Sequence, residues 1–295
     1  MAPPLETAAQ PPVLAPVAIA RTVADLRTTI AAWRAAGETV GLVPTMGALH
    51  AAHMALVQAT QAVCDRTIVT IFVNPAQFGP DEDFGSYPRR EARDMAMLEA
   101  ARVDLLFAPP VAEIYPDGFA TTVAVSGVSE GLCGDRRPGH FGGVATVVAK
   151  LLLQSLPDVA VFGEKDYQQL LVIKRLVRDL DIPVRILPLA TVREADGLAI
   201  SSRNVHLSAG ERAIAPRLYA VLAETAGQIA QGAPPNEAVA TGLEALRAAG
   251  FTNVEYLEAR DSDTLAAADD RTRPLRVLAA AWLGETRLID NVPVP

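Results

Sequence analysis

Short apolar runs alternate with helical patterns through the first two thirds of the chain, and this alternation constrains the fold more than any other feature. Apolar runs of strand length cover residues 39–45, 67–74, 104–109, 158–163 and 183–189. Side chains with helical spacing occupy residues 22–37, 54–64, 88–102, 143–156 and 167–180. Strands that are apolar on both faces are typical of a parallel sheet covered by helices. The pattern therefore predicts an α/β fold, a Rossmann-like parallel sheet with helices on both faces. A further short strand is predicted at residues 121–127.

The pattern changes after about residue 190. Two long helical stretches are predicted at residues 209–232 and 234–250, and the second begins with proline and ends at Gly250. Strands are predicted at residues 254–261, 274–284 and 286–292. We therefore expect a smaller C-terminal α+β domain. The predicted division is a flexible Pro- and Ala-rich extension, a catalytic Rossmann-like domain and a C-terminal domain, at residues 1–20, 21–191 and 192–295.

Composition excludes several classes of protein. The chain has 295 residues, half of them apolar, and a formal net charge of −8. A long basic groove for nucleic acid is therefore not expected. No run of about 18 apolar residues is present, so no membrane span is predicted. Cys64 and Cys133 are the two cysteines, which indicates reduced thiols and a cytoplasmic location without a disulfide framework.

Two histidines stand three positions apart where a predicted strand gives way to a predicted helix. The segment "VPTMGALHAAHMALV" contains Gly47, which suits a tight turn, followed by His50 and His53. A helix N-terminus offers free N–H groups and a partial positive charge, which favours phosphate. Metal ligation has less support, because neither a His-Glu-x-x-His helix nor a cysteine cluster is present. Phosphate binding, metal ligation and a structural role all stay open on spacing alone.

Polar residues also follow two other predicted strands. Lys165 and Asp166, in "FGEKDYQQ", come directly after the strand at residues 158–163. Ligands of parallel sheets bind beyond the carboxyl ends of the strands, where Lys165 can neutralise phosphate and Asp166 can bind a ribose hydroxyl. An ordinary solvated ion pair is the alternative. Gln77 follows the strand at residues 67–74, and its amide can both donate and accept hydrogen bonds.

A cluster of hydroxyls and a guanidinium opens the predicted second domain. Ser201, Ser202 and Arg203 lie in "READGLAISSRNVHLS" and together suit an anion. A helix-capping loop is the alternative, since Ser and Asn favour turns. A segment at a domain boundary could move, as a clamp over phosphates must. Arg137 and His140, in "GDRRPGHFGGV", likewise precede a predicted helix.

Taken together, these segments resemble the pantoate–β-alanine ligase family, which belongs to the nucleotidylyltransferase and class I synthetase superfamily. The matching segments, in order, are "VPTMGALHAAH", "IFVNPAQFG", "EGLCGDRRPGHFGGVATVV", "VFGEKDYQQL" and "TVREADGLAISSRN". The resemblance covers nearly all of the chain after residue 20. It implies ATP-dependent joining of (R)-pantoate to β-alanine through a pantoyl-adenylate, with release of AMP and pyrophosphate. It also implies Mg²⁺, a homodimer, a cytoplasmic location and a C-terminal domain that acts as a lid beside the dimer interface.

The resemblance further implies roles for individual residues. His53 matches the usual proton donor, and the expected catalytic set is completed by His50, Lys165, Ser201, Ser202 and Arg203. The expected ATP contacts are Met46, Gly47, His50, His53, Gly163, Glu164, Lys165, Asp166, Val192, Ile200, Ser201, Ser202 and Arg203. The expected pantoate and β-alanine contacts are Gln77, Gln169, Arg137 and His140. Ligands for Mg²⁺ are left open, because phosphate and water can supply most of them.

One residue departs from the family pattern. The first motif normally reads His-x-Gly-His, whereas here its third position is Ala52. That glycine lets adenine lie against bare backbone, so the methyl group should crowd the base or shift the turn, and weaken ATP binding.

The chemistry fits the residues, because pantoate and ATP are both anions. The histidines, Lys165, the 201–203 cluster and Mg²⁺ are expected to supply positive charge and donors where negative charge builds up. Two other functions stay open. One is a related nucleotidylyltransferase that leaves AMP on its substrate, and the other is a non-catalytic nucleotide-binding protein, degenerate at Ala52.

Overall fold

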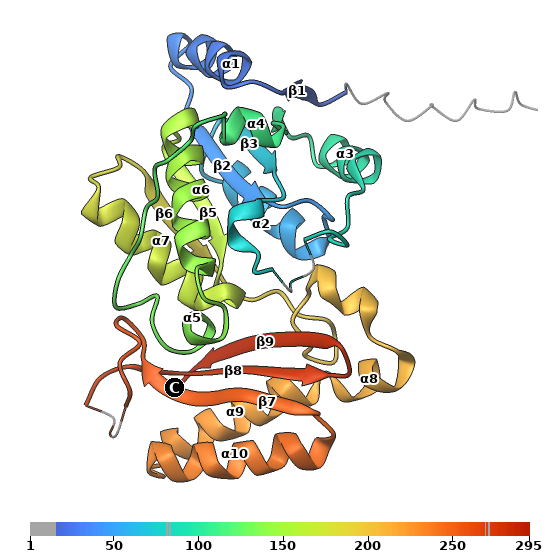
Figure 1. Cartoon of the computed structure of the whole chain (residues 1–295), viewed down its shortest axis with the longest axis vertical. Helices are drawn as coiled ribbons and strands as arrows, with labels where there is room; N and C mark the ends of the chain where they lie inside the picture. Colours follow the sequence, from blue (N-terminus) through green and yellow to red (C-terminus); the bar gives the residue numbers. More distant parts are fainter. Residues whose placement is uncertain (1–15, 81, 83, 269, 271) are drawn as a thin grey trace, which may run out of the picture.

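The computed structural model describes residues 16–80, 82, 84–268, 270 and 272–295, and its main feature is a six-stranded parallel sheet (Figure 1). The strand order is β1-β4-β3-β2-β5-β6. The strands are β1 (Ala18–Ala20), β2 (Val40–Thr45), β3 (Arg66–Ile71), β4 (Leu105–Phe107), β5 (Val159–Gly163) and β6 (Arg185–Leu189). Every neighbouring pair is parallel, which confirms the predicted α/β class.

Helices cover both faces of this sheet. They are α1 (Val23–Ala35), α2 (Ala51–Gln61), α3 (Glu91–Ala100), α6 (His140–Ser155) and α7 (Tyr167–Asp179), with the short α4 (Val111–Ile114) and α5 (Cys133–Arg136). Consecutive side chains of β2 point to opposite faces of the sheet, each covered by its own apolar cluster. Leu42 belongs to the apolar cluster with residues of α1, α6 and α7, and Val43 to the cluster with residues of α2 and α3. Burial on both faces explains why the strands are apolar throughout.

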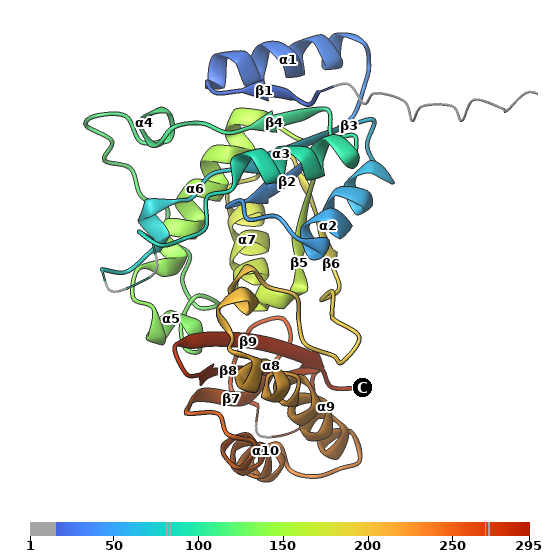
Figure 2. The same cartoon turned by 90° about the vertical axis from the view of Figure 1, so that its right-hand side faces the viewer.

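A second, antiparallel sheet with strand order β7-β8-β9 forms the C-terminal part (Figure 2). Its elements are α8 (Ala209–Ile214), α9 (Arg217–Ala230), α10 (Pro235–Ala249), β7 (Asn253–Asp261), β8 (Leu275–Leu283) and β9 (Thr286–Pro293). Val277 packs into a cluster with residues of α9 and α10, whereas its neighbour Leu278 joins a cluster with Phe141 and Leu171 of the larger domain. The small sheet is thus buried on both faces and joined to the larger domain by apolar contacts.

Four predictions about elements differ from the structure. Within the expected extension of residues 1–20, Val17 is buried and β1 pairs with β4; residues 1–15 lie outside the described residues. Residues 121–127 form no strand: the backbone N–H of Val123 donates instead to Thr146 Oγ1 of α6 at 2.9 Å. The helix expected at 209–232 is divided at Pro216, and α6 begins at His140 rather than at 143.

Three 3₁₀ turns follow strands or open the C-terminal part and carry predicted site residues. They are η1 (Pro75–Gln77), η2 (Glu164–Asp166) and η3 (Ser202–His206). The expected domain boundary at residue 192 falls in the segment between β6 and η3. No helix within the described ranges combines the length and apolarity that a membrane span requires.

Candidate active site

The predicted site residues come together at the carboxyl edge of the parallel sheet. The strand order reverses between β2 and β5, so this pair is the topological switch point at which such sheets bind ligands. His50 follows β2, and Lys165 follows β5. Gln77 follows β3, and Val192 follows β6. The carboxyl ends of four strands therefore each supply a predicted residue to the same edge of the sheet.

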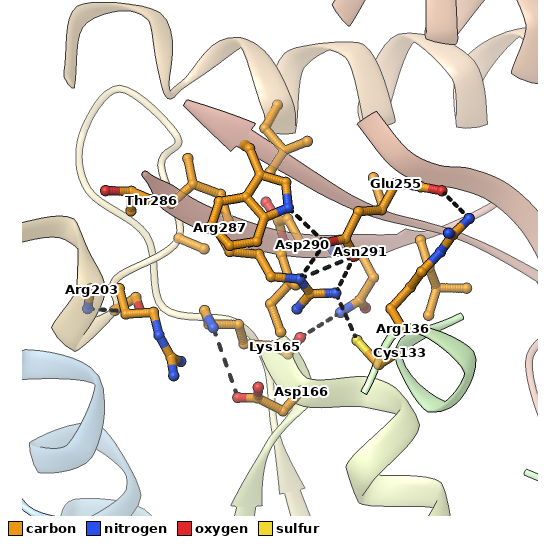
Figure 3. A pocket seen from close by; sticks show the side chains of 18 of the residues that line it. Cys133, Arg136, Lys165, Asp166, Arg203, Glu255, Thr286, Arg287, Asp290 and Asn291 are labelled. Carbon is orange, nitrogen blue, oxygen red and sulfur yellow. Dashed lines mark hydrogen bonds and ion pairs between the residues drawn. The ribbon is translucent and has the colours of Figure 1, made fainter. Parts of the chain in front are cut away.

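A cavity of about 250 Å³ lies at this edge. Its lining includes most of the predicted residues: Met46, His50, His53, Gln77, Arg137, His140, Gly163, Lys165, Asp166, Gln169, Val192, Ile200, Ser201, Ser202 and Arg203, together with Ala52. A larger cavity of about 790 Å³ lies beside the small sheet (Figure 3). The two cavities share the residues Arg137, His140, Lys165, Asp166, Gln169, Ser201 and Arg203. Gly47 and Glu164 are the two predicted residues that line neither cavity.

The turn before His50 explains the role of Gly47. Gly47 has φ +84°, and an added Cβ would lie 3.2 Å from Asp94 Oδ2. Ala48 also has a positive φ, of 52°. The carboxylate of Asp94, in α3 and only 1% exposed, accepts the N–H of Ala48 at 2.9 Å and of Leu49 at 2.8 Å. Gly47 therefore shapes the turn, and Asp94, which sequence reasoning missed, holds it.

The two histidines are stacked, with ring centroids 4.0 Å apart. His50 is the N-cap of α2, and its backbone N–H donates to His53 Nδ1 at 3.3 Å. Neutral His53 therefore carries its ring proton on Nε2, where it can act as a donor. Burial, followed by the charge of Lys165, lowers the pKa of His50 to about 4. Burial and the neighbouring His50 lower the pKa of His53 to about 3.

These pKa values fix the charge of the two rings in the free protein. Both rings are neutral at pH 7 in the free protein, so they supply hydrogen-bond donors rather than positive charge. Positive charge at the smaller cavity comes from the Lys165, Arg137 and Arg203 side chains. The Lys165 ammonium lies 3.9 Å from the carboxylate of Asp166 (Figure 3).

The side chain of Glu164 contacts the small domain and lines neither cavity. Its carboxylate accepts Arg276 Nη2 of β8 at 3.3 Å, so the side chain is directed to the small domain. The expected contact of Glu164 with ATP stays a prediction.

Arg137 and His140 act together on Gln77. The guanidinium of Arg137 binds both oxygens of Glu82, at 2.6 and 2.8 Å, and lies 2.9 Å from His140 Nε2. Burial and the charge of Arg137 lower the pKa of His140 to about 4, so its ring is neutral and Nε2 accepts. His140 Nδ1 then carries the proton and donates to the carbonyl of Gln77 at 2.9 Å. The pair therefore fixes the backbone of a predicted substrate contact.

Asn74 is a site residue that sequence reasoning missed. It is 1% exposed, and its Nδ2 donates to Gln77 Oε1 at 3.0 Å and to the carbonyl of Gly143 at 3.1 Å. Tyr115 donates to its Oδ1 at 2.8 Å. The available signal was its place at the end of a buried strand and directly before proline.

Ser201 caps η3, as the capping alternative expects, and residues 201–203 also line the smaller cavity, where binding of an anion stays a prediction. Ser201 Oγ accepts the N–H of Arg203 at 3.3 Å and caps η3. The segment before it is anchored to β9, because Arg193 binds both carboxylate oxygens of Asp290 at 2.5 and 2.9 Å. The segment that leads to this cluster is therefore attached to the small sheet.

Comparison with known sequences agrees with this arrangement. A family model described as pantoate-beta-alanine ligase matches residues 18–293. Pantothenate synthetase of Paramagnetospirillum magneticum is 59% identical over 278 residues, which cover 94% of this chain and 98% of that protein. Pantothenate synthetase of Rhodospirillum rubrum is 57% identical over 277 residues, with the same coverage of 94% and 98%.

Solved structures agree as well. Pantothenate synthetase from Thermus thermophilus has a TM-score of 0.89 at 48% identity, covering 94% of this chain and 99% of that chain. The Francisella tularensis pantoate-beta-alanine ligase, complexed with beta-gamma ATP and beta-alanine, has a TM-score of 0.79 at 33% identity, covering 94% and 97%. The match to the family model over nearly the whole chain, the sequence identities and the shared fold lead to one conclusion: this chain belongs to the pantoate–β-alanine ligase family.

Proposed function

We propose that the protein condenses (R)-pantoate with β-alanine at the expense of ATP, through a pantoyl-adenylate, and releases AMP and pyrophosphate. The observation that carries this proposal is the gathering of Lys165, the histidine pair and the 201–203 cluster around one cavity, with Gln77 and Gln169 beside them. The Francisella relative was solved with beta-gamma ATP and beta-alanine, which supports ATP and β-alanine as two of these substrates.

The residues suit the first chemical step. A carboxylate oxygen of pantoate attacks the α-phosphorus of ATP, forming a P–O bond while the bond to pyrophosphate breaks. Negative charge then increases on the phosphate oxygens, which the ammonium of Lys165 and the guanidinium of Arg203 stabilise. The neutral ring of His53 donates from Nε2. Nearby phosphate would raise its pKa and so favour the protonated form expected of a proton donor.

The second step needs no protein nucleophile. The amine of β-alanine attacks the acyl carbon of the adenylate, a C–N bond forms, and AMP leaves. Gln77 and Gln169 are suited to hold pantoate, because an amide can bind both hydroxyl and carboxylate groups. We propose that residues 21–191 form the catalytic domain that binds ATP and pantoate. Residues 192–295 add the contacts from Val192 and from Ile200 to Arg203, and we assign to them the role of a lid that excludes water, beside the dimer interface.

Mg²⁺ fits this site as an ion that enters with ATP. No group of three or more His, Cys, Asp and Glu side chains in the described part of the chain is arranged to hold a metal. Magnesium typically takes one or two carboxylates together with phosphates and water, and Asp166 is a carboxylate that lines the cavity. The bound ion would neutralise phosphate charge. A homodimer and a cytoplasmic location are likewise proposed, from the family resemblance, and light scattering of the purified protein tests the dimer.

The test is exchange of labelled pyrophosphate into ATP without β-alanine, with and without pantoate and Mg²⁺. We expect exchange that requires both, and AMP release once β-alanine is added. Exchange without pantoate would favour a different nucleotidylyltransferase. Absence of exchange at saturating ATP would contradict the ligase proposal and favour a non-catalytic nucleotide-binding protein.

A further inference from the structure

The turn that carries Lys165 is held by a side chain of the small domain, Asn291 of β9 (Figure 3). Asn291 is 4% exposed. Its Nδ2 donates to the carbonyl of Glu164 at 2.9 Å and to the carbonyl of Lys165 at 3.0 Å. Its Oδ1 accepts from Nη1 of Arg276. One buried amide therefore binds the two carbonyls that flank the α-carbon of Lys165.

The chemistry of the neighbours fixes the orientation of this amide. Two carbonyl oxygens can only accept hydrogen bonds, and a guanidinium can only donate. A flipped amide would set Oδ1 against both carbonyls and Nδ2 against Arg276, leaving buried groups unsatisfied. An asparagine is therefore suited to this position, whereas aspartate of the same shape would place a negative oxygen against the carbonyls.

Two further side chains connect the small domain to the same turn. The guanidinium of Arg276, in β8, lies 3.8 Å from the ring centroid of Tyr167 and also binds the Glu164 carboxylate. Tyr167 in turn donates to the carbonyl of Ser262 at 2.9 Å. Residues 164–167 are thus attached to the small sheet as well as to β5, from which they continue.

We propose that Asn291 is a positioning residue for the adenylation step, which holds the backbone at Lys165 so that the ammonium faces the phosphate site. This inference rests on the proposed function. Lys165 stabilises charge that increases in the transition state, so a small displacement lowers the rate more than it lowers ATP binding. The two hydrogen bonds from Asn291 also make the position of Lys165 depend on the position of the small domain.

The experiment compares Asn291→Asp and Asn291→Ser with the unaltered full-length protein in pantoate-dependent pyrophosphate exchange. We expect kcat to fall about 10- to 100-fold in both variants, because a misplacement of about 1 Å can cost that much, while KM for ATP changes less than about threefold. Asn253→Asp is the matched control, since Asn253 begins β7 of the same sheet and is exposed. It should leave both constants unchanged.

A merely structural role predicts a different result. Variants that melt at lower temperature but keep the original kcat per folded molecule would overturn the inference, and so would an equal loss in kcat for Asn253→Asp. If Asn291→Asp does not fold, the neutral Asn291→Ser decides the question by the same split between kcat and KM.

A double-mutant cycle tests the link to Lys165 directly. If Asn291 acts through that ammonium, Asn291→Ser should lower the exchange rate in the original protein but not further in a Lys165→Met background. Additive losses would contradict the inference. An original protein without any exchange would instead contradict the proposed function, so the two failures are distinct.

Discussion

At the scale of single residues, the structure shows how the methyl group of Ala52 can affect ATP binding. It is the second residue of α2 and lines the smaller cavity, whereas the preceding Ala51 is exposed and does not. The helix begins at Ala51 with His50 as its N-cap, so the turn keeps its form. The methyl group is expected either to crowd the adenine base or to shift the turn. Because the turn is unchanged, we retain crowding of the base as its expected effect.

We therefore expect Ala52→Gly to lower KM for ATP by roughly 3- to 10-fold, which corresponds to about 1 kcal/mol. The same change should reduce the free energy of unfolding by up to ~1 kcal/mol, because glycine is a poor helix former. Steady-state kinetics and urea unfolding measure the two effects. Ala51→Gly is the control, with the helix penalty but the original KM; equal KM values in both variants would contradict crowding at residue 52.

At the scale of elements, the contact between α6 and η1 sets the place of Gln77. Gly143 of α6 lies so close to η1 that an added Cβ would be 2.1 Å from the carbonyl oxygen of Ala76 and 2.7 Å from Gln77 Cα. At the adjacent Gly142, an added Cβ would meet nothing within 4 Å. The structure thus has no room for a side chain at Gly143 but has room for one at Gly142.

This contrast gives a matched pair of variants. Gly143→Ala must displace η1, and we expect it to lower the free energy of unfolding by about 1–3 kcal/mol, as overpacking does, and to raise KM for pantoate. Gly142→Ala should raise the free energy of unfolding by up to ~1 kcal/mol and leave KM unchanged, since alanine favours the helix. Urea unfolding and steady-state kinetics distinguish them. Similar effects from both substitutions would show that the contact does not position Gln77.

At the scale of the whole molecule, folding places three histidines around one cavity, with His140 buried and His50 and His53 half-buried, and so makes stability depend on pH. The pKa of His50 and of His140 falls to about 4, and that of His53 to about 3, from an ordinary value near 6.5. Below pH 6.5 the unfolded chain binds protons at these rings that the folded protein excludes. Stability is therefore full above about pH 6.5 and is lost as the pH falls towards 4.

The free energy of unfolding should then decrease between pH 7 and pH 5, by at most about 1.4 kcal/mol per pH unit for each histidine. Urea unfolding at several pH values measures this slope. His53→Gln should reduce the slope, because it removes one of the three shifted rings. A protein equally stable at pH 5 and pH 7 would contradict the proposed burial of neutral rings.

Features that depend on residues close together in the chain could be predicted before folding is considered. The spacing of apolar residues and the short apolar runs predicted five of the six parallel strands. Gly250 ends α10 with φ +105°, as expected. The polar residues at strand ends were found because parallel strands bring their carboxyl ends to one edge. The three-residue β1 was missed, since its alanines carry little strand signal and its partner β4 lies far along the chain.

Features that depend on burial and on distant partners arise only in the folded chain. Asp94 binds the turn at Ala48 from 46 residues away, and Asn291 binds the carbonyl of Lys165 from 126 residues away. The protonation of His53 follows from desolvation, which no local pattern records. Local periodicity therefore sets which elements form, while the partners of each buried polar group, and the charge of each titratable one, exist only once the chain has folded.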